Sequence, residues 1–220
     1  MFGQYPRYMI NECINHVKGF LMKPGETFKQ TKEKSIGCAY QYYVGLLIFF
    51  SILFTIVTVA LGIAHFNAVI AQAAAIPFIG KVLSEGLSQF TGFVVLWRLF
   101  AAFTLFLWLL IAVFINGLIF HAFVLLVGGE KGWVQTVKTT MYAYTPALLL
   151  GWIPYIWIIG IIWAIVLFII GISETQEISI GKGFLVIIVP IILTLIWIGL
   201  GAAVIISFID AIVKVIPKPF

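Results

Sequence analysis

The sequence predicts an all-α, polytopic membrane bundle with five transmembrane helices and additional interfacial amphipathic helices. Of the 220 residues, 63% are hydrophobic and 10% are charged, and the mean hydropathy is +1.16. The run 43–64 contains no charged side chain. About 22 helical residues span roughly 33 Å, which matches the hydrocarbon thickness of a bilayer. Further apolar runs follow, separated by turns rich in Gly, Pro or charge.

The first 41 residues are predicted to be a cytosolic, amphipathic and charged segment, and residues 42–220 the membrane domain. Apolar residues recur at helical intervals in this first segment: Ile10, Ile14, Val17, Phe20 and Leu21. We expect this helix to lie in the bilayer interface with its apolar face in one leaflet. An ordinary helix packed against the bundle would show the same spacing. After Pro24, a short charged helix over 26–34 is expected to face water.

The five expected spans cover about residues 43–64, 99–127, 134–152, 155–173 and 184–210. Between the first two, the chain is polar and interrupted by Pro and Gly, so we predict a second interfacial hairpin there.

A turn at Gly151-Trp152-Ile153-Pro154 divides the apolar stretch 134–173 into the third and fourth spans. A kink at this turn, instead of a break, would leave one long helix and four spans in total.

The distribution of basic residues predicts the orientation. With a cytoplasmic N-terminus, nine of the 13 bases lie in inside segments and four in outside segments, as the positive-inside rule requires. An odd number of spans then places the C-terminus outside the cytoplasm, and the location is the cell membrane if the chain is prokaryotic. No cleavable signal peptide is predicted, because no basic patch precedes an apolar core at the N-terminus.

The composition also limits the kinds of partner that we expect the chain to bind. Membrane lipids are expected, with a homo-oligomer or a cytosolic protein as further candidates. Nucleic acid is not expected, because no basic stripe is interleaved with aromatic residues. Cys13 and Cys38 have no second metal ligand nearby in the sequence, so we expect reduced thiols, no metal site and no cofactor.

Few polar residues lie within the expected spans. His121, Glu130 and Lys138 form a candidate polar cluster at the cytoplasmic mouth of the second and third spans. The alternative is that His121 bonds to a neighbouring helix and that the two charged residues are solvated. No catalytic residues are predicted, since no nucleophile stands with a base. The chain is therefore not expected to be an enzyme.

The last span carries a ridge of small residues every four positions: Gly199, Ala203, Ser207 and Ala211. Such a ridge lets two helix backbones approach closely. The contact could join two copies of the chain or two helices of one bundle.

Several motifs, in order, resemble the Yip (Ypt-interacting protein) domain family. They are Pro24-x-x-x-Phe28, His121, Gly128-Gly129, Tyr142-x-Tyr144-x-Pro146, Gly151-x-x-Pro154, Trp163, Gly171, Glu174 and Ser179-x-Gly181-Lys182. The resemblance implies a five-span bundle with a cytosolic N-terminus. In the eukaryotic branch it also implies binding of prenylated Rab-type GTPases. The longer tail and the Asp-Leu-x-Gly-Pro element of that branch are absent here, so the chain resembles a prokaryotic-type member and Rab binding is not carried over.

Taken together, these features favour a non-enzymatic membrane scaffold or adaptor that shapes the membrane or recruits a cytosolic partner or anionic lipid. The alternative is a transporter or channel for ions or small solutes, because Pro146 and Pro190 interrupt two expected spans and could free backbone carbonyls.

Overall fold

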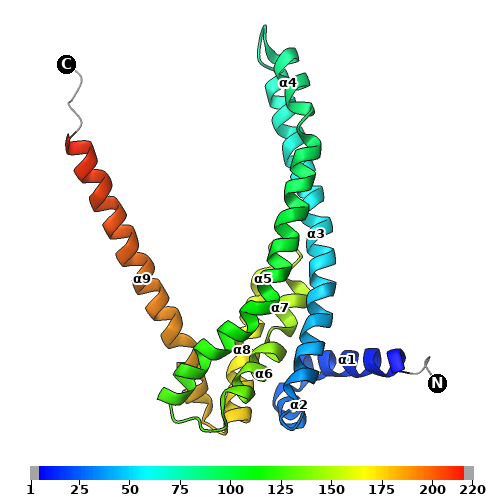
Figure 1. Cartoon of the computed structure of the whole chain (residues 1–220), viewed down its shortest axis with the longest axis vertical. Coiled ribbons are helices and arrows are strands. Elements are labelled where there is room, and N and C mark those ends of the chain that lie inside the picture. Colours follow the sequence, from blue (N-terminus) through cyan, green and yellow to red (C-terminus); the bar gives the residue numbers. More distant parts are fainter. Residues whose placement is uncertain (1–4, 216–220) are drawn as a thin grey trace.

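The computed structural model describes residues 5–215, with side chains described from 12 to 209, and this part of the chain forms only helices (Figure 1). The predicted all-α class is confirmed. The helices are α1 (Tyr5–Met22), α2 (Pro24–Thr31), α3 (Ile36–Ala74), α4 (Gly80–Ser88), α5 (Thr91–Leu126), α6 (Trp133–Ala143), α7 (Thr145–Leu150), α8 (Trp157–Gln176) and α9 (Ile180–Val215).

Two long helices dominate the arrangement. α3 and α5 pack along one another as a hairpin, and α4 lies at its far tip (Figure 1). At the other end, which we call the base, α2, α6 and α8 gather around the ends of this hairpin. α1 runs crosswise to α3 at the base, and α9 leaves the base and diverges from the hairpin.

Four helices are long and apolar enough to cross a membrane: α3, α5, α8 and residues Ile180–Ile209 of α9. They include the first, second, fourth and fifth predicted spans. The predicted turn is also confirmed, because α7 ends at Leu150 and α8 begins at Trp157. The alternative of one long kinked helix is therefore excluded.

The third predicted span, 134–152, is divided between α6 and α7, and neither helix is long enough to cross alone. Pro146 causes the division, because proline has no N–H and its ring crowds the carbonyl four residues earlier. That carbonyl, on Tyr142, accepts a hydrogen bond from Thr145 Oγ1 at 2.6 Å instead. The backbone N–H of Leu148 still donates to the Tyr144 carbonyl at 2.9 Å, so helical bonding resumes at once.

The hairpin between the first two spans differs from the prediction. The first long helix does not turn into the plane of the membrane surface after residue 64: α3 continues to Ala74, and α5 already begins at Thr91. The polar residues His65, Asn67 and Gln72 lie within α3 and do not end this helix. At 39 residues, α3 is about 58 Å long, whereas α8, with 20 residues, is about 30 Å.

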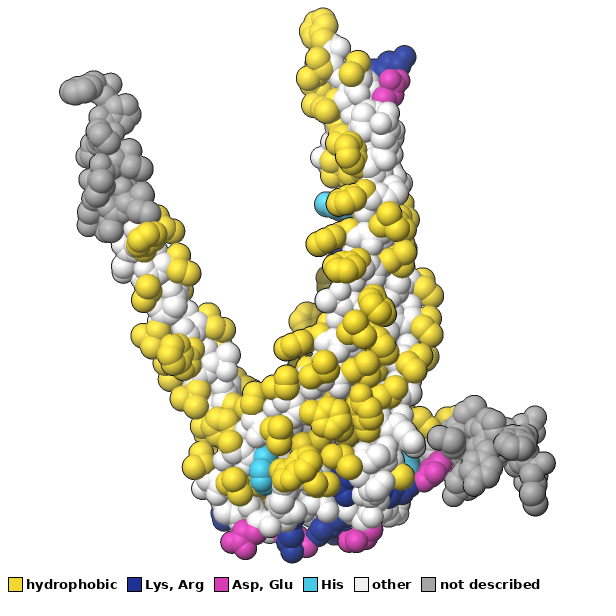
Figure 2. Space-filling view, in the orientation of Figure 1, with side chains coloured by type: hydrophobic (Ala, Val, Ile, Leu, Met, Phe, Trp, Pro, Cys, Tyr) yellow, Lys and Arg dark blue, Asp and Glu magenta, His cyan; other side chains and the backbone are white. Residues whose placement is uncertain are grey.

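The hydrophobic core lies in the base. Aromatic and aliphatic side chains from α1, α2, α3, α6 and α8 meet there, among them Phe20, Phe28, Tyr43, Tyr142 and Leu167. Large apolar residues along the outer parts of α5 and α9 are exposed instead, as expected for surfaces that face lipid (Figure 2). Charged side chains gather at the base and, for Lys81 and Glu85, at the tip by α4.

Candidate functional site

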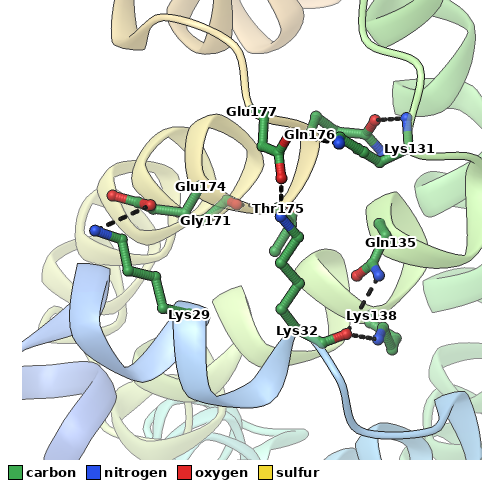
Figure 3. A network of polar contacts seen from close by, with 10 residues as sticks. All are labelled: Lys29, Lys32, Lys131, Gln135, Lys138, Gly171, Glu174, Thr175, Gln176 and Glu177. Carbon is green, nitrogen blue, oxygen red and sulfur yellow. Dashed lines mark hydrogen bonds and ion pairs between the residues drawn. The ribbon is translucent and has the colours of Figure 1, made fainter.

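A network of polar contacts joins α2, α6 and α8 at the base, and we treat it as the candidate functional site (Figure 3). Its centre is Gln176, the last residue of α8, which is almost completely buried. The Gln176 amide donates to the Gly132 carbonyl and to Thr136 Oγ1, both at 3.0 Å, and its oxygen accepts from the Lys131 backbone N–H at 3.0 Å. These bonds fix the loop before α6 against the end of α8.

Lys138 forms the second part of the network. It projects from α6 toward the end of α2, where its Nζ donates to the carbonyls of Lys32 and Lys34, each at 2.7 Å (Figure 3). Gln135 Nε2 also donates to the Lys32 carbonyl, at 3.2 Å. Carbonyls at a helix C-terminus lack partners within the helix and carry partial negative charge, so a buried ammonium group is well matched to them. An eight-residue helix such as α2 is marginal alone and needs this contact.

Ion pairs surround the buried part of the network. Glu177 follows α8 in a left-handed conformation, with φ 56°, and pairs with both Lys131 and Lys32. Hydrogen bonds from these two lysines lower the pKa of Glu177 to about 2. Lys29 and Glu174 add a longer pair at 3.7 Å between α2 and α8.

An aromatic cluster lies beneath the network. The completely buried Phe28 of α2 contacts α8 at Gly171, where an added Cβ would come within 2.5 Å of the ring. Only glycine allows α2 to approach α8 this closely. Phe20 packs on Phe28 and Tyr142, with ring centroids 4.8 and 4.9 Å apart. The end of α1 is thus part of the same core.

A family model described as the Yip1 domain matches residues 18–201, most of the chain. The chain belongs to the Yip1 domain family. Comparison with curated proteins gave no match, and neither did comparison with solved structures. Family membership and the four long apolar helices together make this a multi-pass membrane protein.

Several residues of the Yip1 domain motifs noted in the sequence lie in this region. Phe28, Gly171 and Tyr142 form the aromatic cluster, and Glu174 is on the rim of the network. Tyr144 accepts a hydrogen bond from Asn116 Nδ2 at 3.0 Å, which ties α5 to α6. Part of the motif set, Phe28, Tyr142, Gly171 and Glu174, therefore forms the contact between α2, α6 and α8.

The residues of the predicted polar cluster occupy separate positions in this Yip1 domain. His121 Nδ1 lies 3.0 Å from Thr136 Oγ1, which is the bond to a neighbouring helix that we gave as the alternative. Lys138 points to the end of α2. Glu130 is exposed. No hydrogen bond or ion pair between described residues joins these three to one another.

The predicted interfacial face of α1 is divided between the bundle and the surface. Phe20 does not face the bilayer, because it is completely buried in the aromatic cluster, and Val17 packs partly against the core. Ile14 and Leu21 are 45% and 37% exposed. The side chain of Ile10 lies outside the described residues. One side of α1 is therefore packed against the bundle, as in the alternative given above, and the other side is exposed.

The predicted small-residue ridge on α9 is exposed at Gly199, Ala203 and Ser207, and the side chain of Ala211 lies outside the described residues. Ser207 Oγ donates to the Ala203 carbonyl at 2.8 Å within the helix.

The sequence did not predict the central residues of the network. Gln176, Thr136, Thr139 and Thr175 are buried, and the last two share a hydrogen bond of 2.7 Å across α6 and α8. A polar residue near the end of an apolar helix is expected to face water or headgroups, so the sequence carried no signal that these side chains turn inward.

The chemistry of the network is that of a structural joint with a charged rim. Its donors are matched to backbone carbonyls and hydroxyls, which holds three helices in fixed positions. Within the part of the chain that the structure describes, no group of three or more His, Cys, Asp or Glu residues could hold a metal ion. The charged groups of the ion pairs at the rim are partly exposed at the surface of the base.

Proposed function

We propose that this Yip1-domain protein is a non-enzymatic membrane scaffold that crosses the bilayer five times and shapes the membrane from its cytosolic face. In this proposal α6 and α7 together form the third span, since residues 133–150 would extend about 27 Å. The base lies on the cytoplasmic side, where the lysines of α2 and of the loop before α6 agree with the positive-inside rule. The C-terminus lies on the opposite side, and the location is the cell membrane in a prokaryote.

The position of α1 is the observation that carries this proposal. α1 runs crosswise to α3 at the base (Figure 1), so it lies along the membrane surface if α3 crosses the membrane. Its exposed Ile14 and Leu21 are seven residues apart and share one face of the helix. Such a helix inserts its apolar face into the boundary between headgroups and acyl chains.

The attachment of α1 to the bundle supports a role in shaping. Phe20 is buried in the base, and Glu12 pairs with Lys34 in the turn before α3. The helix is thus fixed to the spanning domain and adds area to the cytosolic leaflet alone, which favours curvature toward the opposite leaflet. The charged rim of the polar network provides the surface on which a cytosolic protein, anionic lipid or second copy would dock.

Reconstitution of the full chain into liposomes tests the proposal. Increasing protein density should produce smaller vesicles or tubules, measured by cryo-electron microscopy. The double variant Ile14→Asp/Leu21→Asp changes only exposed positions and should restore the diameter of protein-free vesicles. The matched control Asn15→Asp adds charge to an exposed polar position of the same helix and should behave as wild type. Vesicles of unchanged shape at every protein density would contradict the proposal.

A transporter for ions or small solutes is the second candidate. It is supported by Pro146, which divides α6 from α7, and by Pro190, which lies inside α9. A cavity of about 230 Å³ lies beside Tyr144 between α5, α6, α8 and α9, but its other lining residues are almost all apolar. Flux of ions and solutes measured in the same liposomes separates the two functions, because the scaffold predicts rates equal to those of empty vesicles.

A further inference from the structure

A second cavity, of about 290 Å³, lies where α1 meets the turn before α3. We call it the α1 cavity. Glu12, His16 and Lys34 line its polar side, while Tyr42, Gly45 and Tyr142 line the side toward α3 and α6. It adjoins the polar network, because the backbone carbonyl of Lys34 accepts a hydrogen bond from Lys138, but the side chains of Glu12, His16 and Lys34 make no contact that holds α2 against α8.

The polar side has unused hydrogen-bonding groups. Lys34 Nζ donates to Glu12 Oε1, and it lies 3.2 Å from His16 Nε2. Because an ammonium group can only donate, His16 Nε2 must accept, and the imidazole proton is then on Nδ1. Among the described contacts this leaves three free groups: one Lys34 N–H, the His16 Nδ1–H and the second oxygen of Glu12. The side chains of Lys34 and Glu12 are 30% and 41% exposed, so a ligand can reach them.

The charge pattern selects the class of ligand. One ammonium and one carboxylate stand side by side with a neutral imidazole, so this wall has no net charge. A ligand with a net negative charge would be repelled by Glu12. A zwitterion that carries both a phosphate and a primary ammonium would instead match all three free groups. A quaternary ammonium has no N–H for Glu12, and the rings of Tyr42 and Tyr142 are too buried to offer their faces to it.

The cavity also has an apolar exit along α3. An added Cβ at Gly45 would have no neighbour within 4 Å, so this position is open. Gln41, Gly45, Ile48 and Ile52 follow one another at helical intervals and are all exposed. A hydrocarbon chain attached to a headgroup in the cavity could lie along this stripe.

We propose that the α1 cavity binds one phosphatidylethanolamine molecule, with its phosphate on Lys34 and His16, its ammonium on Glu12 and an acyl chain along α3 past Gly45. This proposal rests on the proposed function only in placing α1 at the membrane interface. It does not require that the protein change the shape of a membrane.

Native mass spectrometry of the full chain in detergent tests the proposal. Phosphatidylethanolamine, phosphatidylcholine and phosphatidylglycerol with identical acyl chains are added at equal concentration. Wild type should retain the ethanolamine lipid about tenfold more strongly than either other lipid, since loss of one charge-assisted hydrogen bond costs about a factor of ten. Glu12→Gln should remove this preference and favour phosphatidylglycerol, because the wall then carries a positive charge.

Gly45→Leu tests the acyl-chain path. The added Cβ would meet no protein atom within 4 Å, and the leucine side chain should lower retention of the ethanolamine lipid about tenfold. Gly92→Leu is the matched control, because Gly92 is equally open but lies on α5 away from the cavity; it should bind as wild type. Lipid-free melting temperatures verify that each variant is folded.

Two results would overturn the proposal. The first is a wild-type protein that retains phosphatidylcholine or phosphatidylglycerol as strongly as phosphatidylethanolamine. The second is a Gly45→Leu variant that binds the ethanolamine lipid as well as Gly92→Leu does. Both measurements are made in micelles, so their outcome is independent of the vesicle-shape experiment.

Discussion

At the scale of single residues, Lys138 has the most consequential contacts. Lys138 is buried in α6, and its ammonium group donates hydrogen bonds to two backbone carbonyls at the end of α2. A lysine at this place in the sequence suggests a solvated charge at the start of a span. The structure makes it a connection between α6 and the end of α2.

We predict that Lys138→Met destabilises the protein. Methionine preserves the length of the side chain but removes the donor to the Lys34 carbonyl and leaves the Lys32 carbonyl with Gln135 as its side-chain donor, which should cost about 1–3 kcal/mol of unfolding free energy. Denaturant unfolding in detergent measures the change, and hydrogen exchange should increase in α2 before other helices. Lys18→Met, at an exposed position of α1, is the control and should change little. Equal stability of the two variants would mean that Lys138 does not hold α2.

We predict a similar loss for Gly171→Ala, for a steric reason. The new Cβ would come within 2.5 Å of the Phe28 ring, and forced overpacking costs about 1–3 kcal/mol. Gly181→Ala, where an added Cβ meets nothing within 4 Å, should leave the melting temperature unchanged. Combining Gly171→Ala with Phe28→Leu should recover part of the loss, and failure to recover any would locate the strain elsewhere.

At the scale of elements, α1 carries a histidine whose contacts should depend on pH. His16 lies against Lys34 and edge-on to Tyr42, with ring centroids 5.8 Å apart. Burial first, and then the Lys34 ammonium, lower the pKa of His16, while the neighbouring Glu12 opposes this shift. The folded state therefore favours the neutral imidazole.

We predict that acidification loosens α1. A group whose pKa is lowered on folding binds fewer protons in the folded state than in the unfolded state. Its contribution to the stability of the folded state is therefore fully present above the pKa of the unfolded chain, about 6.5, and is lost as the pH falls below that value. Hydrogen exchange of α1, corrected for the intrinsic pH dependence, should therefore rise from pH 7.5 to pH 5. His16→Gln should remove this dependence. A pH response of α1 that persists in His16→Gln would assign it to another group.

The elements also show what the sequence could predict. Hydropathy identified the four long apolar helices and the turn at 151–154, because burial in lipid and the break at Pro154 both leave local signals, but it did not predict the division of the stretch 134–152 into α6 and α7. The length of α3 was not predictable in this way, since polar residues such as Asn67 do not end a helix. Amphipathic spacing cannot distinguish lipid from protein, and for this reason Phe20 was expected in the bilayer and is found in the core. The buried Gln176 and Thr139 depend on long-range packing, which leaves no local pattern.

At the scale of the whole molecule, the base and the tip of the hairpin should lie on opposite sides of the membrane. The exposed Cys38 at the start of α3 provides a natural probe of the base. Ser88→Cys, in a background without the two native cysteines, provides an exposed probe of the tip.

We predict that a membrane-impermeant maleimide labels the Ser88→Cys variant in intact cells and labels Cys38 only after permeabilisation. Cys13→Ser is the background for the second measurement, because Cys13 also lies near the base. Labelling of both probes from the same side would exclude the proposed orientation.

The lengths of α3, α5 and α9 have a consequence for where such a protein resides. The hairpin presents two apolar rods of 39 and 36 residues, nearly twice the 20 residues of α8, and on the opposite flank α9 is again 36 residues long (Figure 1). Lipids next to these long rods must stretch or the rods must lean, and each ångström of misfit carries a small penalty. A protein built this way is best accommodated in a thick bilayer, so membrane thickness alone could sort it laterally.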